Sequence, residues 1–156
     1  MKKDYVVTDP CYILPKDIWN KCIEVCEEYA KDSNWSDMFN KEVENALKEF
    51  TQGQAFVEST GFGDWDNQLL GPNVKNDGGF TADAGMVCVC ELTGAVHKAL
   101  GNAVEKESAA VFMAQGPINV QFDTSKSDWT IVNIEDSEGE CWTTWEPDDD
   151  NEEEDW

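Results

Sequence analysis

The sequence contains no arginine, one histidine and only 11 lysines, against 33 aspartates and glutamates, so its formal net charge is −22. Arginine is the side chain best suited to bidentate contact with phosphates, and phosphate contacts supply most of the affinity of proteins for nucleic acid. The lack of arginine therefore disfavours a direct DNA- or RNA-binding protein, and the acidity disfavours an anionic membrane surface. So negative a molecule attracts metal ions, polyamines or basic protein surfaces.

Long apolar runs are missing as well. The first residues, MKKDYVVTDPC, contain no apolar stretch long enough for a signal peptide or a membrane span. We therefore expect a cytoplasmic protein. Without a secretion signal, the six cysteines are expected to be reduced thiols.

The composition is sufficient for a packed core, since 40% of the residues are hydrophobic and 11% are aromatic. The length fits one domain of ordinary size. We predict a single α+β domain over residues 1–145 and a disordered acidic tail over 146–156, in which Trp156 is the one large apolar residue.

Periodicity predicts the elements. DYVVT is a first strand, residues 16–32 form an amphipathic helix, and a second helix begins after Ser36 as its N-cap and ends at Gly53. A strand AFVEST, a long loop GFGDWDNQLLGPNVKNDGG and a strand FTADAGMVCVCEL follow, then a weaker helical pattern in TGAVHKALGNAVEK. AAVFMAQ, INVQFD, DWTIVNIED and ECWTTW are typical of an antiparallel meander. The predicted fold is an antiparallel β-rich sheet or partial barrel with two N-terminal amphipathic helices packed on it.

Three motifs occur in a fixed order: TDPCYILP at 8–15, TGFGDW at 60–65 and ADAGMVCVCEL at 82–92. Over roughly residues 4–135 this order resembles a family of small bacteriophage and bacterial proteins of unknown function, which carry Asp-Pro-Cys-Tyr, Gly-Asp-Gly-like and Asp-Ala-Gly motifs. The resemblance implies a compact β-rich α+β domain of phage or mobile-element origin. It implies no activity.

The last ten residues, PDDDNEEEDW, combine seven carboxylates with a final tryptophan. This arrangement resembles the C-termini of some phage and bacterial single-stranded-DNA-binding proteins, in which acidic residues and a last aromatic residue dock onto basic grooves of partner proteins. Tryptophan is also enriched among the residues that dominate binding energy at interfaces. The predicted partner-binding residues are Trp142, Trp145, Glu146, Asp148, Asp149, Asp150, Glu152, Glu153, Glu154, Asp155 and Trp156.

Four aspartates, Asp9, Asp64, Asp66 and Asp83, lie beside turns in or near the family motifs. If the fold brings them together, their oxygens suit a divalent cation such as Mg²⁺ or Ca²⁺; apart from a divalent cation, no cofactor is predicted. The favoured alternative is that each carboxylate accepts hydrogen bonds from the backbone of its own turn.

Two cysteine pairs share a face of an expected element: Cys22 with Cys26 on a helix, and Cys88 with Cys90 on a strand. Four such thiolates suit Zn²⁺ if the two elements pack together. Core packing is the favoured interpretation, because free cysteine is among the most buried residue types.

No established catalytic motif occurs, and no catalytic residue is assigned. Cys11, in a turn, is the only thiol considered as a nucleophile, and His97 is interpreted as a surface or packing residue. The sequence therefore favours a non-enzymatic protein.

The leading hypothesis is an acidic phage-type inhibitor that mimics nucleic acid and occupies a basic nucleic-acid-binding surface of a host defence or replication protein. One alternative is a metal-assisted hydrolase of a nucleotide or phosphate ester, built on the four aspartates. Another is a structural, virion-associated protein.

Overall fold

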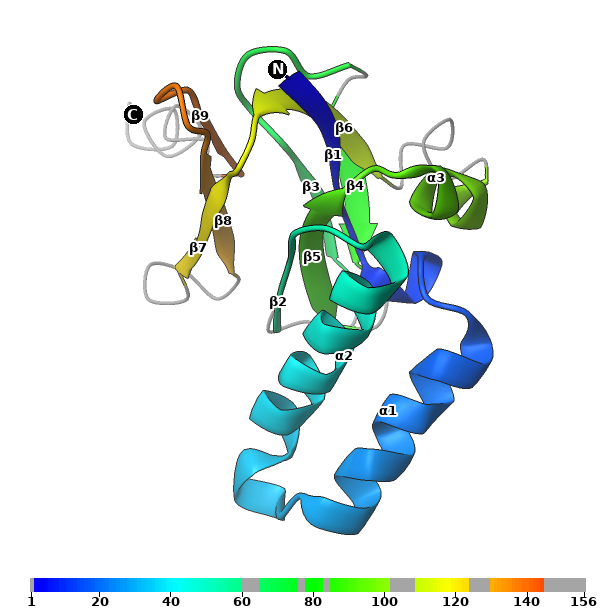
Figure 1. Cartoon of the computed structure of the whole chain (residues 1–156). Helices are drawn as coiled ribbons and strands as arrows, with labels where there is room; N and C mark the ends of the chain where they lie inside the picture. Colours follow the sequence, from blue (N-terminus) through cyan, green and yellow to red (C-terminus); the bar gives the residue numbers. More distant parts are fainter. Residues whose placement is uncertain are drawn as a thin grey trace, which may run out of the picture.

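A computed structural model describes residues 2–59, 65–75, 78–82, 85–101, 109–123 and 130–144 (Figure 1). In chain order its elements are β1 (Lys2–Thr8), the 3₁₀ turn η1 (Pro10–Tyr12), α1 (Lys16–Tyr29), the 3₁₀ turn η2 (Asp32–Asn34), α2 (Trp35–Thr51), β2 (Ala55–Ser59), β3 (Trp65–Gln68), β4 (Gly79–Ala82), β5 (Met86–Glu91), α3 (Gly94–Leu100), β6 (Ala110–Gln115), β7 (Asn119–Asp123), β8 (Ile131–Glu135) and β9 (Cys141–Thr143).

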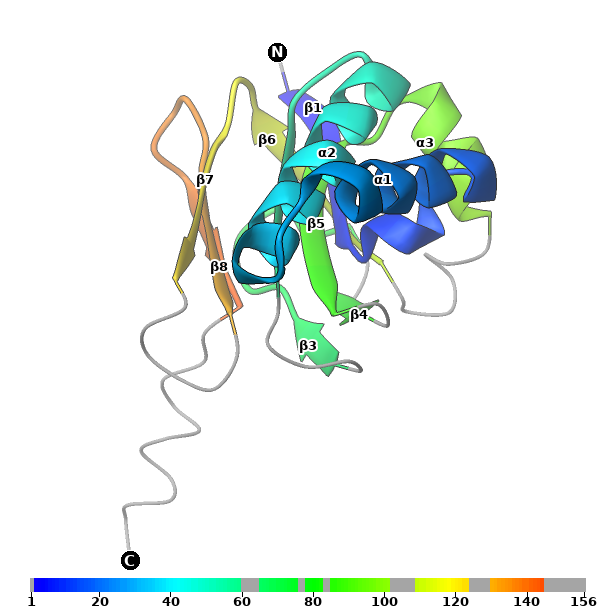
Figure 2. The ribbon, with the colours of Figure 1, turned by 90° about the horizontal axis from the view of Figure 1, so that it is seen from below.

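The strands form three antiparallel sheets. The central sheet has the order β2-β5-β1-β6, a second sheet is the meander β7-β8-β9, and β3 and β4 form a two-stranded hairpin. The helices cover one face of the central sheet and the β7-β8-β9 meander covers the other, so the molecule is layered as helices, sheet and sheet (Figure 2).

The central strands are apolar on both faces because both faces are covered. In β1, Tyr5 and Val7 point into the core that the central sheet shares with the meander, whereas Val6 points into the core beneath the helices. Successive side chains of a strand point to opposite faces, so a buried run such as residues 5–7 of β1 must lie between two layers. β5 repeats the arrangement, with Val87 and Val89 on one side and Cys88 on the other.

The two long helices attach to the sheet unequally. Val43 and Leu47 of α2 are fully buried in the core beneath the central sheet, and α2 packs on both β2 and β5. α1 packs mainly on α2, so the two helices form an antiparallel hairpin that extends away from the sheets (Figure 1). None of the helices in the described part of the chain has the length and apolar character required to span a bilayer.

The predicted arrangement of the fold is wrong, although the α+β class and the antiparallel pairing hold. The helices are not both N-terminal elements on one sheet: β1 begins the described chain, α1 and α2 occupy residues 16–51, and a third helix, α3, follows β5. The strands form separate sheets rather than one sheet or a partial barrel. The physical reason is the double-sided burial of β1 and β5, which requires a layer on each face of the central sheet.

Several predicted boundaries also differ. FTADAGMVCVCEL is two strands in two sheets, β4 and β5, and part of the expected long loop is the strand β3. Ser36 is not an N-cap, because α2 already begins at Trp35 after Asn34. α2 ends before Gly53, with Gln52 in the left-handed conformation at φ 57°. The predicted tail, 146–156, lies outside the described residues.

Candidate interaction surface

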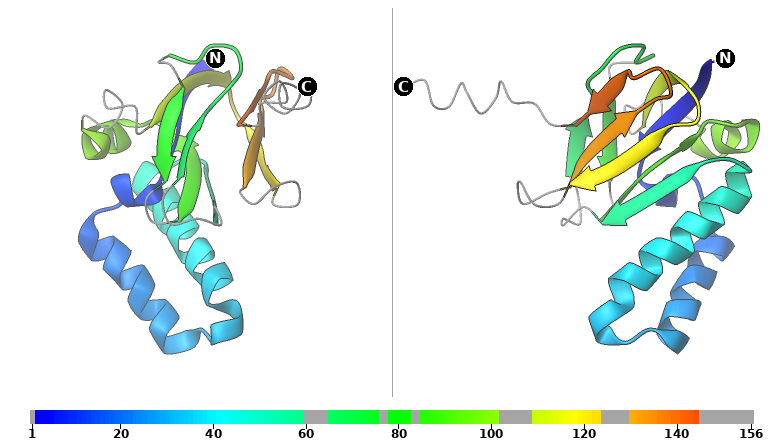
Figure 3. Two further views of the ribbon diagram at one scale, coloured as in Figure 1. Left: turned by 180° about the vertical axis from the view of Figure 1, so that it is seen from behind. Right: turned by 60° about the vertical axis from the view of Figure 1, so that its left-hand side comes forward.

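The β7-β8-β9 meander has one apolar face and one polar face. Val120, Ile134 and Trp142 point into the core shared with the central sheet. Alternation places polar groups on the opposite, outward face, which Figure 3 (right) turns towards the viewer. We call this outward face the acidic sheet face; it comprises Asn119, Gln121, Asp123, Asn133, Glu135, Cys141 and Thr143.

The register orders these side chains in rows across the strands. Asn119 lies opposite Glu135, which lies opposite Cys141, and Gln121 lies opposite Asn133, which lies opposite Thr143. Side chains directly opposite one another in an antiparallel pair have Cβ atoms about 5 Å apart. The face contains a shallow depression of about 490 Å³, which these side chains line together with Ile131, Ile134 and Trp142.

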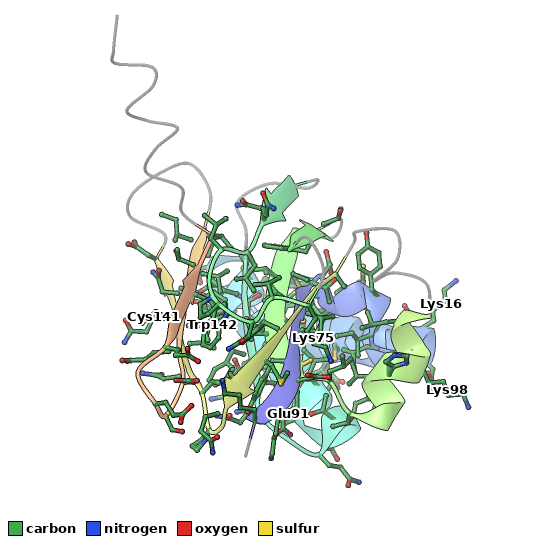
Figure 4. All side chains as sticks on the ribbon, turned by 90° about the horizontal axis from the view of Figure 1, so that it is seen from above. Lys16, Lys75, Glu91, Lys98, Cys141 and Trp142 are labelled. Atoms are coloured by element: carbon green, nitrogen blue, oxygen red, sulfur yellow. The ribbon has the colours of Figure 1, made fainter. Side chains whose placement is uncertain are left out.

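The charge of this part of the chain is of one sign. Residues 109–123 and 130–144 contain no lysine and five carboxylates, namely Asp123, Glu135, Asp136, Glu138 and Glu140. Lys2 forms an ion pair with Glu140 at 3.7 Å from outside these ranges, and Lys126 lies outside the described residues. Figure 4 places Lys16 and Lys98 at the opposite side of the molecule from Cys141.

The turn between β8 and β9 brings three of these carboxylates together. Oxygens of Asp136, Glu138 and Glu140 lie within 4.8 Å of one another, an arrangement that the sequence analysis missed. The available signal was the alternation of acidic residues around Gly139, whose φ of 88° suits a tight turn.

Asp136 organises this turn. Its Oδ1 accepts hydrogen bonds from the backbone N–H groups of Glu138 and Glu140 at 2.9 Å, and its Oδ2 accepts one from Gln115 at 3.1 Å. Burial alone would raise the pKa of Asp136, but these three donors and the charge of Lys2 hold the pKa below its usual value. Asp136 is therefore a buried, ionised structural residue.

The Trp142 side chain is buried, so it does not offer the exposed indole that the prediction of a partner-binding residue assumed. Its indole is 1% exposed, packs on Phe112 with ring centroids 4.9 Å apart and donates a hydrogen bond from Nε1 to the carbonyl oxygen of Pro72. Cys141, the preceding residue, points to the other side of β9 and is exposed (Figure 4). The remaining predicted partner-binding residues, Trp145 and those between 146 and 156, lie outside the described residues.

Of the four predicted metal-binding aspartates, Asp9 is fully described. It is completely buried, and its Oδ1 accepts a hydrogen bond from the backbone N–H of Cys11 at 2.9 Å as the N-cap of η1. This confirms the predicted turn role for Asp9. Asp64 and Asp83 lie outside the described residues, and of Asp66 only the backbone is described, in β3. A metal site built from these aspartates stays a prediction.

The cysteine pairs are packed in the core, as predicted. Cys22, Cys26, Cys88 and Cys90 are at most 5% exposed. Within the described ranges no three of these thiols converge as ligands, so the zinc alternative is not supported. Burial raises the pKa of the Cys22, Cys26 and Cys88 thiols.

The remaining two candidates lie near the surface. Cys11 is half-buried in η1, and His97 is exposed on α3.

Comparison of the chain with protein-family models, with curated proteins and with solved structures finds no match.

Proposed function

We propose that the protein is a non-enzymatic interaction protein whose acidic sheet face occupies a basic, nucleic-acid-binding surface of a cytoplasmic host defence or replication protein. One observation carries the proposal: an ordered sheet presents carboxylate, amide and hydroxyl groups outward from segments that contain no lysine. The origin in a phage follows from the motif resemblance alone.

The geometry suits the mimicry of phosphates. Side chains on one face of a strand repeat about every 6.7 Å along it, so Asp123 and Glu135, at opposite ends of the β7-β8 ladder, are roughly 13 Å apart. The ladder fixes these positions before binding, which lowers the entropic cost of association. A negative face steers basic partners and suppresses acidic ones.

The predicted acidic tail adds further negative charge to the C-terminal part of the sequence. Residues 146–155 follow β9 in the sequence after two further residues and carry eight carboxylates and no lysine. Their charge has the same sign as that of the face, so attraction of a basic partner would draw on both segments.

The test is a pull-down of basic proteins from a bacterial lysate at low and high salt, followed by affinity measurements on the retained protein. The test variant is Asp123→Lys combined with Glu135→Lys. The control is Glu24→Lys with Glu27→Lys, which changes two exposed carboxylates of α1. Both double variants reduce the formal net charge from −22 to −18, because each replaces two carboxylates with two lysines.

We expect the face variant to weaken binding at least about 30-fold and the control less than about threefold, since only the former places like charges in the interface. Alkylation of Cys141 should be slowed when the partner is bound, because this exposed thiol lies in the face. An equal loss in both double variants, or an affinity that does not change with salt, contradicts the proposal.

A further inference from the structure

A second surface lies between the two long helices. An open groove of about 450 Å³ runs between α1 and α2, which lie side by side in Figures 1 and 3. Its lining residues are Ile18, Lys21, Cys22, Val25, Glu42, Asn45, Ala46, Glu49 and Phe50. Among them Cys22 is buried and Ile18, Val25, Ala46 and Phe50 are half-buried, so they form the floor, whereas Lys21, Asn45 and Glu49 are exposed at the edges.

The apolar stripe of α1 extends past the end of the groove. Ile18, Cys22, Val25 and Tyr29 follow one another at intervals of four, three and four residues, so they share one helix face. Tyr29 is 67% exposed and is the one large hydrophobic side chain of the described residues that is strongly exposed. The stripe is about 16 Å long at a rise of 1.5 Å per residue, which matches three turns of a second helix.

Carboxylates outnumber lysine along the groove. Glu42 and Glu49 line it from α2 and Lys21 lines it from α1, and Glu28 lies beyond the lining on the same face of α1 as Lys21, seven residues away. In the described part of the chain no ion pair engages Lys21, Glu28, Glu42 or Glu49. The groove thus combines an apolar floor with unpaired carboxylates.

We propose that the α1-α2 groove binds a basic amphipathic helix of another protein. Its floor would receive the apolar face of that helix, Tyr29 would cover one end, and the carboxylates would pair with lysine or arginine at the flanks, which is the helix-in-groove mode of recognition. The proposal is independent of the acidic sheet face.

Two other occupants are disfavoured by charge. A second copy of this chain would bring two molecules of net charge −22 together. The chain's own C-terminal segment, residues 146–156, has no basic residue to pair with Glu42 and Glu49. A basic helix is the occupant that complements both the apolar floor and the acidic edges.

The probe is an 18-residue peptide of leucine and lysine with all leucines on one helical face. A second peptide of the same composition but scrambled order measures general attraction to an acidic protein. Binding is titrated at about 0.15 M salt, where long-range attraction is screened within about 8 Å. We expect the full chain to bind the amphipathic peptide at least about tenfold more tightly than the scrambled one.

Two substitutions locate the binding site. Ala46→Trp fills the groove without changing the charge, and Ala99→Trp, on the exposed surface of α3, is the matched control. Tyr29→Ala removes an exposed ring and should leave the fold intact, as circular dichroism would verify. We expect Ala46→Trp and Tyr29→Ala each to weaken binding of the amphipathic peptide about tenfold, and Ala99→Trp to weaken it less than twofold.

Equal binding of the two peptides, or equal affinity in Tyr29→Ala and the unsubstituted protein, would overturn the proposal. The variant with Asp123→Lys and Glu135→Lys separates the two surfaces. It should bind the amphipathic peptide as the unsubstituted protein does, within about twofold, even if the proposed role of the acidic sheet face is wrong.

Discussion

Asp136 and Glu138 lie two residues apart in the turn between β8 and β9, but their environments differ. Asp136 is 5% exposed and accepts three backbone hydrogen bonds, whereas the Glu138 side chain is exposed to solvent. A buried carboxylate is stable only when it is hydrogen-bonded, and an exposed one is solvated by water. The same chemical group is therefore structural at one position and part of the surface charge at the other.

We predict that Asp136→Ala lowers the free energy of unfolding by about 2–4 kcal/mol, because it leaves three backbone N–H groups without their acceptor. Chemical denaturation at pH 7 measures the loss. Glu138→Ala, in the same turn, is the control and should change stability by less than about 0.5 kcal/mol. Similar losses in both variants would contradict the structural role of Asp136.

The pH dependence of this effect has a definite sign. The pKa of Asp136 is lower in the folded protein than its usual value, so the carboxylate stabilises the fold above the usual aspartate pKa. This stabilisation is lost as the pH falls through the lowered, folded-state pKa. The difference in stability between the unsubstituted protein and Asp136→Ala should therefore shrink as the pH falls below about 4. A difference that is constant from pH 7 to pH 3 would show that the ionised carboxylate is not what stabilises the turn.

At the scale of elements, side-chain hydrogen bonds join two sheets that share no β-ladder. The amide of Gln54, just before β2, donates from Nε2 to the carbonyl of Ile118 and accepts from its N–H through Oε1, each at 2.9 Å. Ile118 immediately precedes β7, and at the far end of β2 Thr130 donates to the carbonyl of Ser59. The edge strand of the central sheet is thereby linked to the meander at both ends.

We predict that Gln54→Ala costs about 2–3 kcal/mol of folding free energy, since two hydrogen bonds to one buried backbone unit are lost together. Gln121→Ala removes the same side chain from the exposed face of β7 and should cost less than about 0.7 kcal/mol. Thermal unfolding of both variants provides the comparison. A cost below 1 kcal/mol for Gln54→Ala would mean that water replaces the lost bonds and that this link does not hold the sheets together.

Local patterns in the sequence predicted α1 well and β3 poorly. The period of apolar residues in 16–32 depends on α1 alone, and the helix spans Lys16–Tyr29. β3 is four residues long and polar after its first residue, Trp65. It is a strand because Asp66 pairs with Thr81 and Asn67 with Phe80 of β4. Pairing between distant segments leaves no mark on so short a stretch, so turn-forming residues around it led to the prediction of a loop.

In the candidate site, too, local patterns predicted some features, whereas others depend on how the strands pair. Trp142 was predicted at the surface because tryptophan is typical of interfaces, and the two tryptophans of ECWTTW give no sign of which one faces the core. The acidic sheet face could be predicted only as polar alternation in β7 and β8. Which of these side chains lie next to one another depends on the strand register, in which Asn119 pairs with Glu135 and Glu135 with Cys141. No local pattern in the sequence encodes this register.

Over the whole molecule, negative charge greatly exceeds what ion pairs can offset. Four ion pairs occur in the described part of the chain, and in each of them the lysine side chain is at least 38% exposed. Exposed pairs of this kind contribute roughly 0–1 kcal/mol each. Repulsion among 33 carboxylates opposed by 11 lysines is therefore the larger electrostatic effect, and it destabilises the compact state.

We therefore predict that raising the salt concentration from about 10 mM to about 0.5 M stabilises the protein, by about 1–2 kcal/mol or about 2–8 °C in Tm. Screening weakens the four ion pairs as well, but it weakens the more numerous repulsions further. A truncated chain ending at Thr144 loses eight carboxylates but keeps every lysine, so its formal net charge is −14. Salt should therefore raise its stability by less than it raises that of the full chain. Differential scanning calorimetry of both chains measures the two slopes. A Tm that falls with salt would mean that the ion pairs outweigh the repulsion. The charged residues would then serve mainly to stabilise the fold rather than to attract a basic partner.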